Sequence, residues 1–220
     1  MKKLIMFLSV ILLIDQAKAQ KKENFYLSPV AVDNSVTVSM PKEFIRTTNG
    51  GQETISANGT FGSMVVVRSQ NPANSKVVKN EKGLNNVFEE YVKKVQSSLT
   101  NGTIINQHNT IVGKLEMCDF ILQVDTGSGL QSRHFRLLYT TNTSYTFEYL
   151  YDDFRKDLAI PEMNTFFQSI KTAPDLDRAD QYIISTQSGR PMIVNILLFG
   201  LLPLVVIIVT IVYFRRKPAY

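Results

Sequence analysis

The sequence predicts an α+β fold, in which a central antiparallel β-sheet is flanked by helices and followed by one C-terminal transmembrane helix. Three observations lead to this prediction. Apolar runs occupy both ends of the chain, segments of alternating polarity recur between them, and two segments carry apolar residues at helical spacing. The predicted divisions are a signal peptide at 1–19, an extracytoplasmic domain at 20–172, a juxtamembrane linker at 173–191, a transmembrane helix at 192–214 and a cytoplasmic tail at 215–220.

Residues 1–19 have the three parts of a secretory signal peptide. Lysines stand at positions 2 and 3, an apolar run fills 4–14, and the triplet AKA at 17–19 places small residues where signal peptidase cleaves. The apolar run is too short to cross a bilayer core of about 30 Å. We therefore expect cleavage after Ala19.

Two strands are predicted before the first helix. Asn34–Met40 alternates apolar with polar residues, and Pro41 ends this strand because proline has no N–H to donate to a ladder. Phe61–Arg68 contains the run MVVV, which indicates a strand buried on both faces. A polar lead-in, two turns and a polar loop are expected at 20–30, 47–51, 58–59 and 71–82.

The strongest helical signal lies at 84–99, where apolar residues recur at spacings of three and four. They form one stripe that should pack on the sheet: Leu84, Val87, Phe88, Tyr91, Val92, Val95 and Leu99. Asn101-Gly102 should end this helix, because glycine readily adopts left-handed backbone angles. Strands are then expected at Thr103–Val112 and Glu116–Val124, with a break near Gly113 and a turn at 126–129.

The most informative segment is a β-hairpin around Asn142. Phenylalanine, leucine and tyrosine stand at 135, 137 and 139 before the turn, and aromatic residues stand at 145, 147, 149 and 151 after it. A turn centred on Asn142 places both rows on one face of the sheet. This register also pairs Arg136 with Glu148, and opposite charges across two strands are favourable. The aromatic rows predict core packing, with binding of a planar or sugar ligand as the alternative.

A polar link at 152–157 should connect the hairpin to a closing helix. Apolar residues at helical spacing mark this helix at 160–170, with Pro161 in the first turn, where its missing N–H costs nothing. The linker at 173–191 carries proline, charges and a Ser-Gly pair, and one helical turn is expected near 177–182.

Residues 192–214 form an uncharged run of 23 residues. At about 1.5 Å per residue this run reaches roughly 34 Å and can cross a bilayer. The triplet RRK at 215–217 follows, and positive residues beside a span stay on the cytoplasmic side. The lipid bilayer is therefore one expected partner. Asn195 is expected at the membrane interface, and Pro203 can kink the helix.

The short Lys-Lys signal and the Asn-, Ile- and Lys-rich composition indicate a bacterial protein. We therefore expect a single-pass protein of the inner membrane with its N-terminal domain in the periplasm. Sequons at Asn58, Asn101 and Asn142 would be glycosylation acceptors in a eukaryotic secretory pathway. In a bacterium such triplets arise by chance.

The charge distribution excludes nucleic acid as a partner. The chain has a formal net charge of +5, of which the signal peptide supplies +2 and the tail supplies +3. The extracytoplasmic domain is therefore neutral, and it lacks the basic patch that nucleic-acid binding requires.

Few residues are candidates for chemistry. Cys118 is the only cysteine and is expected to be a small buried residue, while His108 and His134 lie in no nucleophile motif. The carboxylates of Asp152, Asp153 and Asp157 could coordinate a cation, but their spacing does not fit a calcium loop, and a solvated link is the simpler interpretation. The sequence has no phosphate loop, zinc helix or nucleophile elbow. It therefore predicts no catalytic, cofactor-binding or metal-binding residue, and no enzymatic activity.

The order of the elements resembles the PsbP-like superfamily. The segments that carry the resemblance are VTVSMPKEF at 36–44, the helix LNNVFEEYVKKVQSSL, the hairpin end SYTFEYLYDDF and the terminal MNTFFQSIKT. That superfamily includes an extrinsic subunit of the oxygen-evolving complex, a Ran-binding nuclear-transport factor and bacterial secreted domains. The resemblance covers 34–172 and implies a sheet flanked by helices in a protein that binds other proteins. This chain departs from it by its C-terminal anchor, and no family site residue is carried over.

Two functional hypotheses remain open. The first is a single-pass, membrane-anchored binding or accessory domain, which serves without catalysis as a subunit or assembly factor of an envelope complex and binds a protein there. The alternative is a membrane-tethered small-ligand or lipid-binding domain, or a hydrolase with an unrecognised site. Ionisable groups lining one pocket would favour the alternative. An exposed patch on a domain without such a pocket would favour the first.

Overall fold

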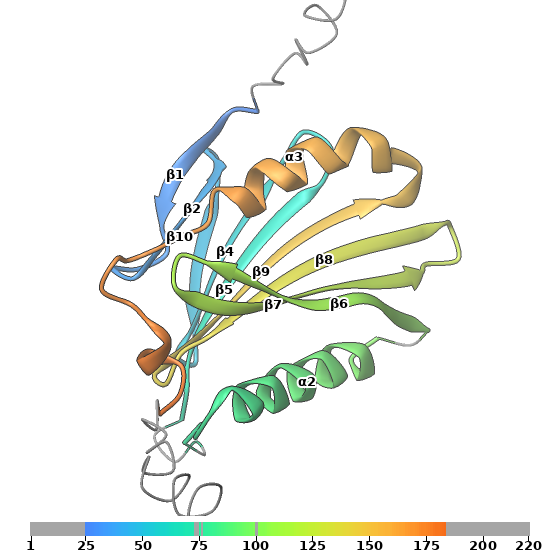
Figure 1. Cartoon of the computed structure of the whole chain (residues 1–220). Helices are drawn as coiled ribbons and strands as arrows, with labels where there is room; N and C mark the ends of the chain where they lie inside the picture. Colours follow the sequence, from blue (N-terminus) through green and yellow to red (C-terminus); the bar gives the residue numbers. More distant parts are fainter. Residues whose placement is uncertain (1–24, 73–74, 76, 100, 184–220) are drawn as a thin grey trace, which may run out of the picture.

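The computed structural model describes residues 25–72, 75, 77–99 and 101–183. In this part of the chain, two antiparallel sheets and two α-helices form one α+β domain (Figure 1). The predicted signal peptide, transmembrane helix and cytoplasmic tail, with Asn195 and Pro203, lie outside the described residues. Within the described residues, no helix combines the length and the apolar character needed to cross a membrane.

Seven strands form the main sheet, in the order β3-β4-β5-β9-β8-β7-β6 with every neighbouring pair antiparallel. They are β3 (Ile45–Asn49), β4 (Gln52–Asn58), β5 (Ser63–Gln70), β6 (Gly102–Val112), β7 (Leu115–Asp125), β8 (Leu130–Tyr139) and β9 (Thr143–Asp152). A smaller sheet contains β1 (Leu27–Ala31), β2 (Val36–Pro41) and β10 (Lys171–Thr172), with β2 in the middle. The predicted central antiparallel sheet is confirmed.

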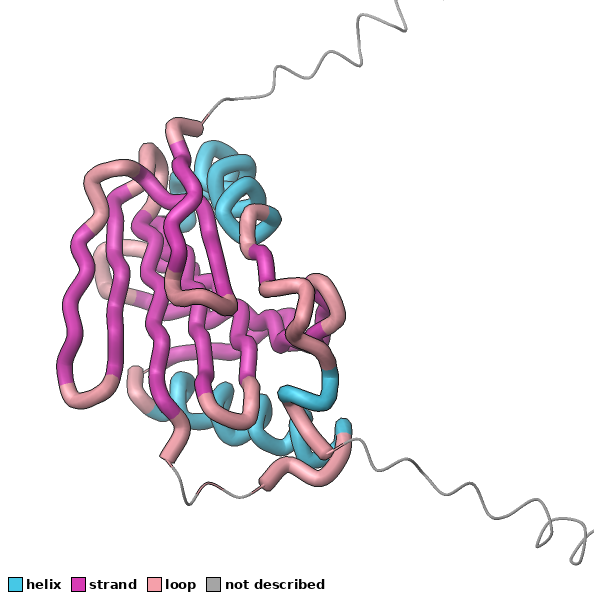
Figure 2. Tube along the Cα trace, turned by 90° about the vertical axis from the view of Figure 1, so that its left-hand side faces the viewer, coloured by secondary structure: helices cyan, strands magenta, loops and turns pink. Residues whose placement is uncertain are grey.

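The two α-helices cover opposite faces of the main sheet, on different strands (Figure 2). α2 (Glu81–Ser97) packs on β6 and β7, and it begins where the Asn80 side chain accepts a hydrogen bond from the Gly83 N–H at 2.9 Å. α3 (Lys156–Gln168) follows the 3₁₀ turn η1 (Asp153–Arg155) and packs on β9 and β2. The predicted stripe of α2 is confirmed, because its buried residues are Leu84, Phe88 and Val92.

The turn of the β8–β9 hairpin is shorter than the sequence suggested. It contains only Thr141 and Asn142, because Thr140 pairs with Thr143: the Thr140 N–H and hydroxyl donate to the Thr143 carbonyl at 2.9 and 2.8 Å. The turn also receives contacts from distant segments, including a 2.7 Å bond from the Asn71 amide to the Thr140 carbonyl. These contacts select a register one residue away from the predicted one.

This shift sends the two aromatic rows to opposite faces, because side chains alternate along a strand. Phe135 lies opposite Glu148, and the row at 135, 137 and 139 packs under α2. The row at 145, 147, 149 and 151 packs under α3. The predicted pair of Arg136 and Glu148 does not form, since Glu148 instead binds Arg133, with 3.0 Å between Nε and Oε1. Core packing of both rows is confirmed, but on two faces.

Several predicted element boundaries are also corrected. The expected lead-in contains β1, and the expected turn at 47–51 is the centre of the β3–β4 hairpin. Neither β1 nor β3 has an apolar face to reveal it, since every residue of β3 is exposed. The Val65 and Val67 side chains of β5 are only half-buried, because neither helix packs over that part of the face. After α2, the left-handed residue is Asn101 (φ 65°) rather than Gly102.

α3 also begins earlier than predicted, at Lys156, so that Pro161 lies inside the helix. The residues expected to form a polar link are instead the end of β9, the turn η1 and the first turn of α3. Asp157 is favourable in that first turn, because a carboxylate interacts well with the positive end of the helix dipole.

The first part of the predicted linker belongs to the domain. The 3₁₀ turn η2 (Arg178–Asp180) confirms the expected helical turn, and the Gln181 side chain after it is fully buried. Its Oε1 accepts from the Glu116 N–H at 2.9 Å, and its Nε2 donates to the carbonyls of Glu116 and Tyr139 at 2.7 and 3.0 Å. Gln181 therefore bridges β7 and β8 beyond their last ladder pair, and the domain extends past the predicted boundary at 172.

Candidate functional site

A groove of about 580 Å³ lies beside α3, over strands β6, β7 and β8. These strands are covered by α2 on their other face, whereas α3 sits over β9 and leaves this face open. Met163 and Phe167 of α3 line one side of the groove. Both histidines of the chain also line the groove, His108 from β6 and His134 from β8. No sequence motif predicted that they would lie together.

An ion pair between Asp119 and Arg136 crosses the groove from β7 to β8. The Arg136 Nε and Nη2 donate to the two Asp119 oxygens at 2.8 and 2.6 Å. Its Nη1 donates to the Phe167 carbonyl at 3.1 Å, and its guanidinium carbon lies 5.2 Å from the centroid of the Phe167 ring. Arg136 therefore joins the sheet to the C-terminal end of α3, where a cation is favourable.

His134 sits beside this pair and is neutral at ordinary pH. Its Nε2 lies 3.1 Å from the Tyr151 hydroxyl. Burial and the nearby Lys156 lower the pKa of His134 to about 4, and the opposing effect of Asp119 is smaller. A histidine with this pKa is the uncharged imidazole near pH 7, with one N–H and one acceptor nitrogen.

A β-bulge in β6 forms the rim of the groove. The pairing of β6 with β7 shifts between Ile105 and His108, and Asn106 adopts a left-handed conformation with φ 53°. Bulges of this kind are common beside binding sites because they leave peptide groups outside the ladder. The His108 Nδ1 lies 2.9 Å from the Asn106 carbonyl. Each ionisable side chain that lines the groove thus has a polar partner, although that of His134 is Tyr151 of β9, which lies outside the groove lining.

Cys118 is buried under α2, as expected. Burial, together with the charges of Asp119 and Glu116, raises the pKa of its thiol to about 12. The thiol is therefore protonated and inert at neutral pH. Among the described residues, no three His, Cys, Asp or Glu side chains are grouped so that they could hold a metal ion, and this includes Asp152, Asp153 and Asp157.

The burial of Glu162 was not predicted from the sequence. Its carboxylate lies under α3 and accepts hydrogen bonds from the N–H groups of Thr60 and Phe61 at 2.8 and 2.9 Å. It also accepts one from the Tyr149 hydroxyl at 2.7 Å, which together with burial raises the pKa of Tyr149. A Cβ at Gly59 would lie 2.8 Å from the Glu162 oxygens, so a larger residue there would displace this carboxylate. Glu162 ties α3 to the β4–β5 turn.

Asp33 makes a second polar cluster at the other end of the α3 side. It accepts from the Arg68 Nε and the Tyr145 hydroxyl, both at 2.7 Å, and from the Ser35 N–H at 2.8 Å. Burial alone would raise the pKa of Asp33, but these hydrogen bonds outweigh it and lower that pKa. Burial and Asp33 raise the pKa of Tyr145 to about 12. The cluster connects the β1–β2 turn to β5 and β9.

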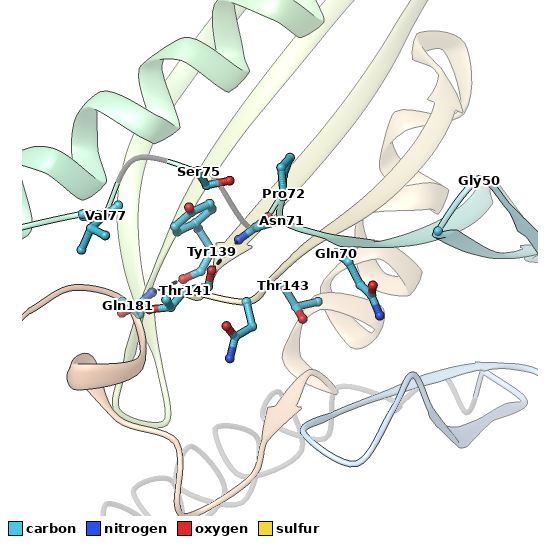
Figure 3. Close-up of a pocket in the computed structure, with 13 residues that line it drawn as sticks. Gly50, Gln70, Asn71, Pro72, Ser75, Val77, Tyr139, Thr141, Thr143 and Gln181 are labelled. Atoms are coloured by element: carbon cyan, nitrogen blue, oxygen red, sulfur yellow. Dashed lines mark hydrogen bonds between the residues drawn. The ribbon is translucent and has the colours of Figure 1, made fainter.

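A cavity of about 710 Å³ lies at the end of the sheet where the C-terminal segment packs (Figure 3). Gln181, Tyr139, Thr141 of the hairpin turn and Thr143 at the start of β9 line one side of it (Figure 3). None of its lining residues carries a charge. The cavity thus offers hydrogen-bonding groups without acid–base chemistry.

No protein-family model matches the sequence, and a search of curated proteins finds no match. The structure is similar to that of cyanobacterial PsbP (CyanoP) from Synechocystis, with a TM-score of 0.51 and 15% identity over 67% of this chain and 93% of that one. It is also similar to LpqN, involved in cell envelope biogenesis of Mycobacterium tuberculosis, with a TM-score of 0.47 and 9% identity over 72% of this chain and 96% of that one. The described domain has a PsbP-like fold, as the sequence predicted.

Proposed function

We propose that this protein is a single-pass, membrane-anchored extracytoplasmic domain that holds a protein partner in the bacterial envelope and has no catalytic activity of its own. The observation that carries this proposal is the way the C-terminal segment is fixed to the domain. Besides the Gln181 contacts, the Thr141 N–H donates to the Asp180 carbonyl at 2.6 Å, and the Ile183 N–H donates to the Val78 carbonyl at 3.0 Å.

This attachment sets how far the domain can move from the membrane. Eight residues, 184–191, separate Ile183 from the predicted span. Fully extended, they reach at most about 27 Å. The sheet end that contains the β8–β9 turn is therefore held near the bilayer. Confinement of this kind raises the effective concentration of a binding domain for partners at the same surface.

The groove supports binding over catalysis, because each of its ionisable side chains already has a hydrogen-bond or ion-pair partner. The fold shared with a cyanobacterial PsbP is consistent with an accessory role, although fold alone does not assign function.

The test is to release the domain from its anchor in cells. A chain that ends after Ile183 keeps the Gln181 bridge and should remain folded and soluble, but should fail to complement a strain that lacks the protein. Replacing 192–214 with an unrelated transmembrane helix should restore complementation. Full activity of the released domain, or turnover of a substrate by it, would refute the proposal.

A small-ligand function is the second candidate, and the ionisable lining of the groove favours it. If a ligand occupies the groove, native mass spectrometry of the full-length protein should show a bound small molecule. The variant Asn164→Trp, which places an indole at an exposed groove position on α3, should lose that molecule. If this variant kept the bound molecule, the ligand-binding site would not be the groove.

A further inference from the structure

Two apolar side chains near the start of α3 are exposed and do not pack into either core of the domain. Phe154 in η1 is 80% exposed, and Leu158 in the first turn of α3 is 54% exposed. They lie four residues apart at the junction of η1 and α3, and both side chains are exposed, whereas Ala159 and Met163 of α3 are buried in the core. We call Phe154 and Leu158 the distal patch. Neither residue lines the groove.

The surroundings of the distal patch have the composition of a protein interface. The Arg155 guanidinium carbon lies 5.1 Å from the centroid of the Phe154 ring, and Arg155 forms no ion pair with any described residue. Leu130, which is 40% exposed, lies at the start of β8, the strand that contacts η1. Exposed aromatic residues combined with arginine and bordered by polar groups are typical of binding hot spots.

The distal patch lies at the end of the sheet opposite the C-terminal exit (Figure 1). Strand β9 connects the two ends: it begins at the turn that Asp180 contacts and finishes at Asp152, next to η1. Its ten residues span about 30 Å at 3.3 Å per residue. With the anchor at the C-terminal exit, the distal patch points away from the bilayer.

We propose that the distal patch is the surface that binds the protein partner, an inference that rests on the proposed function above. The partner is a different extracytoplasmic protein, with an apolar pocket for Phe154 and a hydrogen-bond acceptor for Arg155. The lipid surface lies at the other end of the domain. We assign the patch to a different protein rather than to a second copy, because a second copy offers Arg155 the same arginine, which has no ion pair among the described residues, and not an acceptor.

The experiment places a photoreactive phenylalanine analogue at position 154 of the full-length protein in cells. A matched control carries the analogue at Ile111, which is 62% exposed on edge strand β6. Illumination should give one discrete adduct with another protein at 154 and none of that size at 111. Leu158→Ser should reduce the yield of the adduct about tenfold or more, as expected for a hot-spot residue.

A functional arm uses Phe154→Ser combined with Leu158→Ser. This variant should lose complementation while its thermal midpoint stays unchanged, because both side chains are exposed. Full complementation, an adduct with a second copy, an adduct with lipid, or no adduct at 154 would overturn the proposal. If the double variant fails to fold, the adduct and its dependence on Leu158 decide the question. If the released domain is inactive but the double variant is active, the distal patch is not the binding surface and the tethered function still stands. If the released domain is active, the tethered function itself is refuted.

Discussion

The core under α2 and the core under α3 lie on opposite faces of one sheet, and they are built from different interactions. Under α2 the packing is apolar, and the rings of Phe120 and Phe135 are stacked with centroids 4.8 Å apart. Under α3, aromatic side chains surround the buried carboxylate of Glu162, and Asp33 accepts hydrogen bonds at the edge of the same core. One core depends on shape and burial, and the other also depends on satisfied hydrogen bonds.

This difference affects how each core responds to mutation. An apolar core loses stability in proportion to the volume removed from it. A core with a buried carboxylate loses stability when a polar partner is removed, even if the volume is unchanged, because the remaining donors are left unpaired. Substitutions in each core and a pH titration separate the two cases.

The largest effect is expected from Phe88→Ala in the α2 core. Phe88 is buried against the sheet, and its truncation should lower the free energy of unfolding by about 3–5 kcal/mol. Lys93→Ala, on the exposed side of the same helix, should change it by less than about 0.5 kcal/mol. Urea denaturation measures both. Equal and small effects would mean that α2 does not pack through this face.

A smaller effect is expected from Glu162→Gln in the α3 core. The amide has nearly the same volume, but it presents an NH₂ group where Glu162 accepts from three donors. The loss of charge-assisted hydrogen bonds should cost about 2–3 kcal/mol, and Tyr149→Phe, which removes one of the donors, about 1 kcal/mol. If Glu162→Gln were neutral in the same urea assay, the two cores would not differ in the way described.

The smallest effect is a loss of stability in acid that originates on the α3 side. His134 titrates at about pH 4 in the folded protein, below the ordinary value of 6.5. Between these values the unfolded chain binds a proton that the folded chain does not, so stability falls as the pH falls from about 6.5 to 4. Because His134 is partly exposed, we expect about 1–2 kcal/mol over this range.

His134→Gln should remove this part of the acid sensitivity, which urea denaturation at pH 7 and pH 5 can measure. The lowered pKa of Asp33 acts in a lower range: its stabilisation is lost only as the pH falls below about 3.8. If the free energy of unfolding of the wild type and of His134→Gln depended on pH in the same way, His134 would be solvated in the folded protein.

Elements with strong periodicity could be predicted from the sequence. The stripe of α2 and the alternating β8 and β9 were recognised because each residue's burial follows from its position in a regular element. Strands β1, β3 and β4 were missed: β1 is defined by its pairing with β2, β3 shows no apolar face, and β4 buries only Ile55 and Ala57. The groove was not predicted, because His108, Asp119, His134 and Arg136 come from three strands and lie in no common motif.

The sequence by itself determined the presence of the hairpin, the face of α2 and the order of the elements, because local periodicity and turn residues encode these properties. Only the tertiary structure decided the hairpin register, since Asn71 and Asp180 contact the turn from distant parts of the chain. A shift of one residue reverses the face of every side chain in a strand. The tertiary structure thereby divided the aromatic residues between two cores, and it also buried Glu162 and Gln181, whose hydrogen-bond partners come from distant parts of the chain.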